Sequence, residues 1–257
     1  MKKVEIILKC VFILDKKNVL FLFFMVFFSS MQAQDRYVQR WQIGMQGGAG
    51  YMLANTKKME EDLLRSMANK TTAGDFCKNL SRGSNYGADI HYMFNHWGGI
   101  GVKYSGFYSS ASIYRIFDPF GVGSLVFTNM EKRLYINFFG LSFRTQQYIT
   151  SSNKFRLIMD IAFGYAHYRD EEEYDYYWLS NYLLKSNNIG ANSEIGVEYF
   201  PLRWMSIGVS ASCFLAWFQK GTVTDGNNSV TVKFKDHLLE NINASRLDLS
   251  IGIKIFL

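Results

Sequence analysis

The stretch from Ile189 to Phe218 alternates in polarity with a period of two, and no other feature limits the fold of this chain as strongly. On both sides of Pro201 the residues at alternate positions are largely apolar, and glycine, small polar residues and glutamates lie between them. A period of two puts successive side chains on opposite faces of a β-strand. The stretch therefore predicts a β-hairpin whose strands exceed the usual length of about five or six residues.

One face of this predicted hairpin is apolar along most of its length, whereas the other face carries small polar groups and carboxylates. In transmembrane β-barrels the apolar face contacts lipid and the polar face lines a closed interior. The hairpin is therefore typical of a β-protein that stands in a lipid bilayer.

Six further segments show the same alternation, which brings the expected number of strands to about eight. These segments are Trp41–Leu53, Asn85–Phe94, Gly99–Ser109, Arg133–Tyr148, Phe155–Tyr168 and Ala244–Leu257. Connections after the first, third, fifth and seventh strands are longer than the others, as in bacterial outer-membrane barrels with long external loops and short periplasmic turns. An even strand number lets the first and last strands pair, so no open edge faces lipid. We predict an all-β fold, a closed up-and-down antiparallel transmembrane β-barrel.

The fourth segment contains an irregularity in its alternation. Phe139, Leu141 and Phe143 alternate with small or polar residues, but the parity of the pattern changes upstream, at Asn137 and Phe138. A β-bulge inserts one extra residue into a strand and produces such a change. We therefore predict a bulge at this point.

The beginning of the chain has the pattern of a secretory signal peptide. Val19–Phe28 is a dense apolar run, too short for a membrane-spanning helix of about 20 residues, with charges before it and small or polar residues after it. We predict a signal peptide at residues 1–34 and a barrel domain at residues 35–257. Residues 1–34 hold five Lys and two acidic residues, so their removal lowers the net charge from +6 to +3. No basic patch with interleaved aromatics remains, and we expect no nucleic-acid partner.

Ionisable residues gather on the predicted inward faces of the strands. They are five acids and five bases with one histidine beside them: Asp89, His91, Lys103, Arg144, Arg156, Asp160, Glu194, Glu198, Arg246, Asp248 and Lys254. The interior of an eight-stranded barrel is just wide enough for side chains to fill, and buried charges are costly unless they are paired. We expect a salt-bridged internal network in which Arg156 and Glu198 approach each other. A narrow ion or proton path through this network is the alternative.

Catalysis by the chain would require a nucleophile and a base, usually serine with histidine and an acid. His91 shares its predicted face with Asp89, but the sequence offers no serine that can be chosen as their partner. We therefore assign no catalytic residue. Cys77 falls in a predicted loop and Cys213 on an apolar strand face, so neither a disulfide nor a zinc site is expected. No metal and no cofactor are predicted.

An acidic, aromatic segment at residues 170–178 is the most distinctive of the predicted external connections. Its carboxylates are oxygen ligands suited to Ca²⁺, but they lack the spacing and the turn glycine of a Ca²⁺ loop, so a solvated loop is favoured. Its aromatic residues suit a binding surface. The predicted interaction loop comprises Glu171, Glu172, Glu173, Tyr174, Tyr176, Tyr177 and Trp178. A girdle of aromatic residues near the periplasmic turns is expected to contain Trp97, Tyr199, Phe200 and Trp204.

The predicted mature chain resembles the small eight-stranded outer-membrane β-barrel family, the group of OmpX, OmpW and the OmpA transmembrane domain. The resemblance is carried by the signal peptide, the strand rhythm, the hairpin with Gly-Val-Glu-Tyr-Phe and Arg-Trp-Met-Ser-Ile-Gly-Val, and a chain that stops inside its last strand. In that family the barrel assembly machinery recognises a terminal aromatic residue. Here Phe256 is penultimate and Leu257 ends the chain.

The resemblance implies a protein of the bacterial outer membrane, surrounded by outer-membrane lipid, but it does not imply one activity. We expect a non-enzymatic barrel whose loops serve surface stability, adhesion or contact with an extracellular or envelope protein. A lipid-modifying outer-membrane enzyme and an accessory subunit of an envelope export machine are the alternatives.

Overall fold

The computed structural model describes residues 39–54, 57–65, 70–117, 126–150, 153–175, 181–225, 228–234 and 242–257. All of the described elements belong to one compact unit, residues 39–257. The predicted signal peptide at residues 1–34 lies outside the described residues and stays a prediction.

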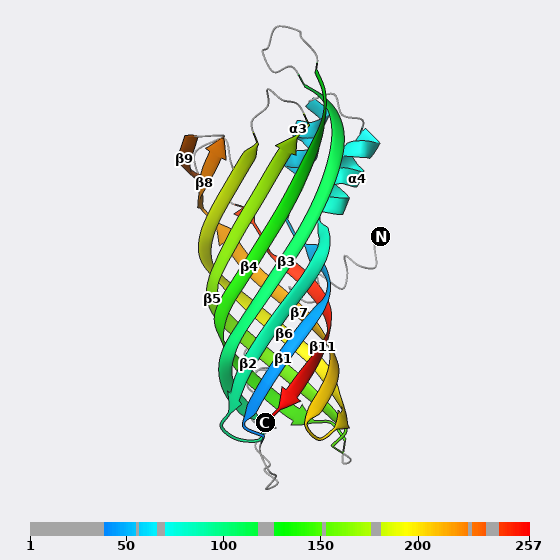
Figure 1. Ribbon diagram of the computed structural model, residues 1–257, viewed down its shortest axis with the longest axis vertical. Coiled ribbons are helices and arrows are strands. Elements are labelled where there is room, and N and C mark those ends of the chain that lie inside the picture. Colours follow the sequence, from blue (N-terminus) through cyan, green and yellow to red (C-terminus); the bar gives the residue numbers. More distant parts are fainter. Residues whose placement is uncertain are drawn as a thin grey trace, which may run out of the picture. The chain divides into compact units, whose positions relative to one another are not determined.

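Eight antiparallel strands close into a hydrogen-bonded ring. In ring order they are β1 (Trp41–Met52), β2 (Arg82–Met93), β3 (Gly98–Phe117), β4 (Val126–Tyr148), β5 (Phe155–Tyr174), β6 (Tyr182–Leu202), β7 (Met205–Phe218) and β11 (Arg246–Phe256). β11 pairs with both β7 and β1, which leaves no open edge in the ring. Figure 1 shows these strands tilted side by side. The prediction of a closed barrel of about eight strands is confirmed.

The outward face of the ring is apolar over one part of its height. On β5 the outward residues from Phe155 to Tyr165 are all apolar or aromatic, and on β11 Leu249 and Ile251 expose 67% and 65% of their surface. Ten residues of a strand that tilts by roughly 35–45° rise about 25 Å along the barrel axis. We call this zone the apolar band, and "above" it means toward the end of the ring at which α3 and α4 lie in Figure 1.

Above the apolar band the strands continue, and their two faces exchange polarity. Ile136 and Phe138 are buried inside the ring, whereas Tyr135 and Asn137 point outward. The pairing of β4 with β3 and β5 runs through this region without a shift. The predicted bulge at Asn137–Phe138 is therefore wrong, because the apolar residues change sides while the strand register does not.

Two helices lie in the connection between β1 and β2: α3 (Lys57–Arg65) in the polar part of that connection, and α4 (Lys70–Leu80), which was not expected. α4 buries Ala73, Phe76, Cys77 and Leu80, a spacing of i, i+3, i+4 and i+7 that places them on one helix face. Cys77 thus lies in a packed helix and not in a loop. Neither described helix is long and apolar enough to cross a membrane.

The connection between β7 and β11 contains a second hairpin, made of β8 (Lys220–Asp225) and β9 (Asn228–Lys233), and the short β10 (Ile242–Asn243). β7 pairs with β6 up to Gly190, and beyond it residues 182–185 of β6 pair with β8. We call the strand ends above the apolar band, with α3, α4, β8 and β9, the head. Phe107, Phe138, Phe214, Phe218 and Phe234 belong to its hydrophobic core, together with the buried face of α4.

Candidate functional site

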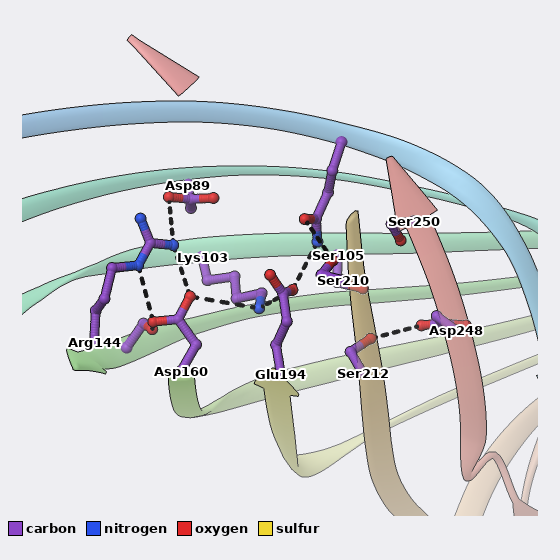
Figure 2. A network of polar contacts seen from close by, with 12 residues as sticks. Asp89, Lys103, Ser105, Arg144, Asp160, Glu194, Ser210, Ser212, Asp248 and Ser250 are labelled. Carbon is purple, nitrogen blue, oxygen red and sulfur yellow. Dashed lines mark hydrogen bonds and ion pairs between the residues drawn. The ribbon is translucent and has the colours of Figure 1, made fainter. Parts of the chain in front are cut away.

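The interior at the level of the apolar band is filled by ion pairs between different strands. Arg144 on β4 is fully buried, and its Nη2 lies 2.7 Å from Asp160 Oδ2 and 2.8 Å from Asp89 Oδ2. Figure 2 shows the guanidinium between these two carboxylates, which β5 and β2 contribute. The negative charges of these two carboxylates compensate the positive charge of the buried guanidinium.

Lys103 extends this network across the lumen. Its Nζ lies 2.6 Å from Glu194 Oε2 and 3.9 Å from Asp160 Oδ2 (Figure 2). The Gln46 amide donates to Glu194 Oε2 at 2.8 Å. Asp160 and Glu194 stand directly opposite each other on β5 and β6. Like charges in that position repel, and the ammonium between them removes the repulsion.

A second ion-pair cluster fills the interior near the short turns. Arg156 pairs with Glu198, its cross-strand partner, as predicted, and Lys254 Nζ lies 2.8 Å from the other oxygen of Glu198. The Arg156 guanidinium carbon lies 4.7 Å from the ring centroid of Phe200 and 4.6 Å from that of Phe256. Phe200 therefore stacks inside the lumen, and its predicted place in the lipid-facing girdle is wrong.

At the upper limit of the charged zone, arginine again stacks on aromatic rings. Arg246 Nε lies 2.9 Å from Asp248 Oδ2, and its Nη2 donates to Ser105 Oγ at 2.7 Å. Its guanidinium carbon lies 4.5 Å from the Phe214 centroid and 5.4 Å from the Phe107 centroid. The charged interior thus ends directly against the apolar core of the head.

The structure buries every residue of the predicted internal network, each with 7% or less of its surface exposed. Beside the ion pairs, glutamine, serine and asparagine side chains on the same faces add hydrogen bonds to the network, and none of these was predicted. They include Gln42, Gln46, Asn85, Ser105, Ser142, Gln146, Ser212 and Ser250. Their only sequence signal is their alternation with outward apolar residues, which marks a face but not a partner.

His91 connects an acid to a serine. Its Nδ1 lies 3.0 Å from Asp89 Oδ2, and its Nε2 lies 3.0 Å from Ser142 Oγ. His91, Gly101 and Ser142 lie at one level on β2, β3 and β4, and a Cβ on Gly101 would come within 2.7 Å of His91 Cδ2. The missing side chain of Gly101 thus allows the imidazole to reach a serine two strands away.

The hydrogen-bonded series Asp89, His91 and Ser142 has the order of a catalytic acid, base and nucleophile. It lies, however, inside the packed interior. His91 and Ser142 expose 0% and 1% of their surface, and Ser142 Oγ also lies 3.4 Å from Asp160 Oδ1. A second carboxylate next to the hydroxyl would oppose the negative charge that develops during acyl transfer. The geometry fits a structural hydrogen-bond chain.

The described part of the acidic segment, residues 170–175, is strand up to Tyr174 and is partly buried. β5 runs to Tyr174, Asp170 is 7% exposed, and Lys132 Nζ lies 2.9 Å from Asp170 Oδ2 and also pairs with Glu172. The prediction of a solvated loop is therefore wrong for residues 170–174. Asp170 lies above the apolar band, and burial raises its pKa, while Lys132 lowers it and Glu172 raises it further.

Glu171 and Glu173 of this segment face outward and are held by arginines. Glu171 pairs with Arg169, and Glu173 Oε2 lies 3.0 Å from Arg133 Nη2. No group of three histidine, cysteine or acidic residues within the described part of the chain could hold a metal ion. Tyr176, Tyr177 and Trp178 of the predicted interaction loop lie outside the described residues.

Comparisons with known proteins find matches only among solved structures. No family model matches the chain, and no curated protein matches it. The outer membrane protease OmpT of Escherichia coli matches with 8% identity and a TM-score of 0.48, over 88% of this chain and 99% of its own. A major outer membrane protein of Thermus thermophilus matches with 10% identity and a TM-score of 0.49, over 84% of this chain and 99% of its own. The outer membrane protein OprG of Pseudomonas aeruginosa matches with 11% identity and a TM-score of 0.44, over 86% of this chain and 100% of its own.

The matched chains are bacterial outer-membrane proteins, one of which is a protease. At these identities and TM-scores they support no inference about activity or partners. The architecture follows from the closed strand ring, the apolar band and the paired charges of the interior.

Proposed function

We propose that this protein is an integral outer-membrane β-barrel that is sealed, non-enzymatic and carries an extracellular head for contact with a partner protein. The apolar band around a filled, charge-paired interior is the observation that carries the proposal. Only helices and closed barrels satisfy all backbone hydrogen bonds in lipid. An apolar belt of about 25 Å fits the hydrocarbon layer that such barrels cross.

The direction of insertion follows from the lengths of the connections. The turns after β2, β4 and β6 are short, whereas the connections that hold α3, α4, β8 and β9 lie at the other end of the ring. Outer-membrane barrels place short turns in the periplasm and elaborated connections outside the cell. The head is therefore extracellular, and the Arg156 cluster faces the periplasm.

Gel mobility and liposome insertion test the membrane assignment. The protein without residues 1–34 should insert into phospholipid vesicles and migrate differently in a gel before and after boiling, because the closed ring resists detergent at room temperature. A protein that stays in the aqueous fraction, with one mobility before and after boiling, would contradict the proposal.

The β8–β9 hairpin supports the proposed contact with a partner. β9 is a short, exposed strand at the end of the sheet order, and Val230 exposes 61% of its surface. An unpaired strand edge offers backbone groups to a partner.

Replacing residues 221–233 by a two-residue turn should abolish adhesion to the partner while the barrel still inserts. Alanine substitution of Ser110 and Ser112, which are exposed on β3, is the matched control. Adhesion that survives the hairpin deletion would contradict this role.

A lipid-modifying enzyme is the second candidate, since Asp89, His91 and Ser142 form an ordered chain. Substituting Ser142 by alanine in the native strain separates the two proposals. If these hydrogen bonds are only structural, Ser142→Ala should leave the pattern of membrane lipids unchanged and make the barrel less stable. A lipid pattern that changes in Ser142→Ala, with the barrel still inserted, would favour the enzyme.

A further inference from the structure

Two rows of outward side chains mark the upper edge of the apolar band on β4, β5 and β6. The lower row consists of Asn137, His167 and Asn187, which stand opposite each other on the three strands. The next row consists of Tyr135, Arg169 and Lys185, again directly opposite each other. These are the first polar rows above the last apolar outward positions, the level at which lipid head groups meet a membrane barrel.

Arg169 and Lys185 form a cross-strand pair of like charge. Residues directly opposite on antiparallel strands have Cβ atoms about 4.5–5.5 Å apart, and like charges there are destabilising. Arg169 leaves 45% of its side chain exposed, and Lys185 is exposed as well. Both cations therefore point into the same outward space.

Elsewhere in this barrel an opposite charge bridges such like-charged pairs. Lys103 lies between Asp160 and Glu194 in the lumen. On the outer face of the head, Arg133 contacts both Glu131 and Glu173, at 2.8 and 3.0 Å.

The pair of Arg169 and Lys185 differs from these two in its surroundings. Glu171 pairs with Arg169, but within the described ranges no carboxylate forms an ion pair with Lys185. An anion between the two cations would complete the pattern.

We propose that Arg169 and Lys185 bind the phosphate of an outer-leaflet lipid head group. The proposal rests on the proposed membrane function, since it needs the apolar band to set the depth of the barrel. A guanidinium binds phosphate through paired donors and an ammonium binds it as a point charge. Tyr135, whose ring centroid lies 5.7 Å from the Arg169 guanidinium carbon, orients the arginine. The amide and imidazole groups of the lower row face the part of the head group that joins the phosphate to the acyl chains.

Native mass spectrometry of the folded barrel, with bisphosphorylated lipid A and its dephosphorylated form as probes, tests the proposal. The wild type should retain the phosphorylated lipid, and Arg169→Gln with Lys185→Gln should retain it about five- to tenfold less, because two charge-assisted contacts are lost. Arg40→Gln with Arg203→Gln removes the same charge from exposed positions at the opposite end of the barrel and should leave retention unchanged.

Each outcome decides a separate question. Equal retention by the two double variants, or equal retention of the dephosphorylated lipid, overturns the phosphate site while the barrel still inserts. Displacement of the lipid by inorganic phosphate at equal concentration assigns the site to the free anion and also overturns the proposal. A protein that fails to insert into vesicles refutes the proposed membrane function itself, and the lipid site falls with it.

Discussion

At the scale of single residues, the interior is stabilised by charges whose partners come from other strands. Arg144, Asp160 and Lys103 lie at positions that the alternation assigns to the inside, and their burial could be predicted from the sequence. Which carboxylate meets which base could not be predicted in full, because that depends on the register of β3, β4, β5 and β6. Arg156 and Glu198 were an exception, since each lies close to a short turn, at the same end of two neighbouring strands.

Asp160→Asn should destabilise the barrel by about 3–5 kcal/mol, because it leaves Arg144 and Lys103 with less compensating charge in a dry interior. Glu131→Gln, which weakens an exposed pair with Arg133, should cost about 0–1 kcal/mol. Urea unfolding in phospholipid vesicles, followed by tryptophan fluorescence, measures both values. Equal losses for the two variants would contradict a paired interior.

Asp170 should make the stability of the head depend on pH. Burial raises its pKa in the folded protein, so the folded state holds this proton more tightly than the unfolded chain, whose aspartates titrate near pH 3.9. Stability should then fall as the pH rises from about 4 through the raised pKa, and level off above it. Asp170→Asn should remove this fall from unfolding curves recorded over the same pH range. Parallel curves for the variant and the wild type would contradict the prediction.

At the scale of elements, the strands were predicted well within the apolar band and poorly above it. β7 ends at Phe218, where the predicted hairpin ends, whereas β3, β4 and β5 run several residues further than predicted. The reason is physical: outside the bilayer, water meets the outer face and the apolar residues move to the inner face. The same alternation then looks like a slipped register, as at Asn137 and Phe138. α4 was missed because only four residues form its apolar face, and because the sequence before it is polar.

Packing of α4 should control access to Cys77. Phe76→Ala leaves a cavity in the core of the head, and such truncations cost about 3–5 kcal/mol. Burial, with a smaller contribution from Glu60, raises the pKa of the Cys77 thiol, and a buried thiol reacts slowly. In a Cys213→Ser background, maleimide should therefore label Cys77 slowly when Phe76 is present and faster in the Phe76→Ala variant. Equal labelling rates would show that α4 does not depend on this contact.

At the scale of the whole barrel unit, paired charges and the apolar core of the head obstruct the lumen in series. An ion would have to pass the stacked Arg156, the Lys103 network and the rings around Arg246. The sequence predicted a filled interior from strand number and charge balance, but the apolar core above it was not foreseen, because its residues come from connections as well as strands.

Protein reconstituted in planar bilayers should show no steady ion conductance, and the double variant Arg246→Ala with Phe107→Ala should conduct ions most readily. Stable open channels in the wild type would contradict a sealed barrel.

The closure of the ring by β11 has a consequence for how the protein folds. Gln42 pairs with Phe256, a separation of 214 positions along the chain (256 − 42), and β11 must pair with β7 at the same time. Contacts between distant parts of a chain form slowly, since the loop entropy is lost before the contacts are gained. Until the eleven residues of β11 arrive, β1 and β7 present unpaired edges that lipid does not tolerate. Insertion should therefore be coupled to synthesis of the final strand, and a chain truncated before Arg246 should accumulate as an aggregation-prone intermediate.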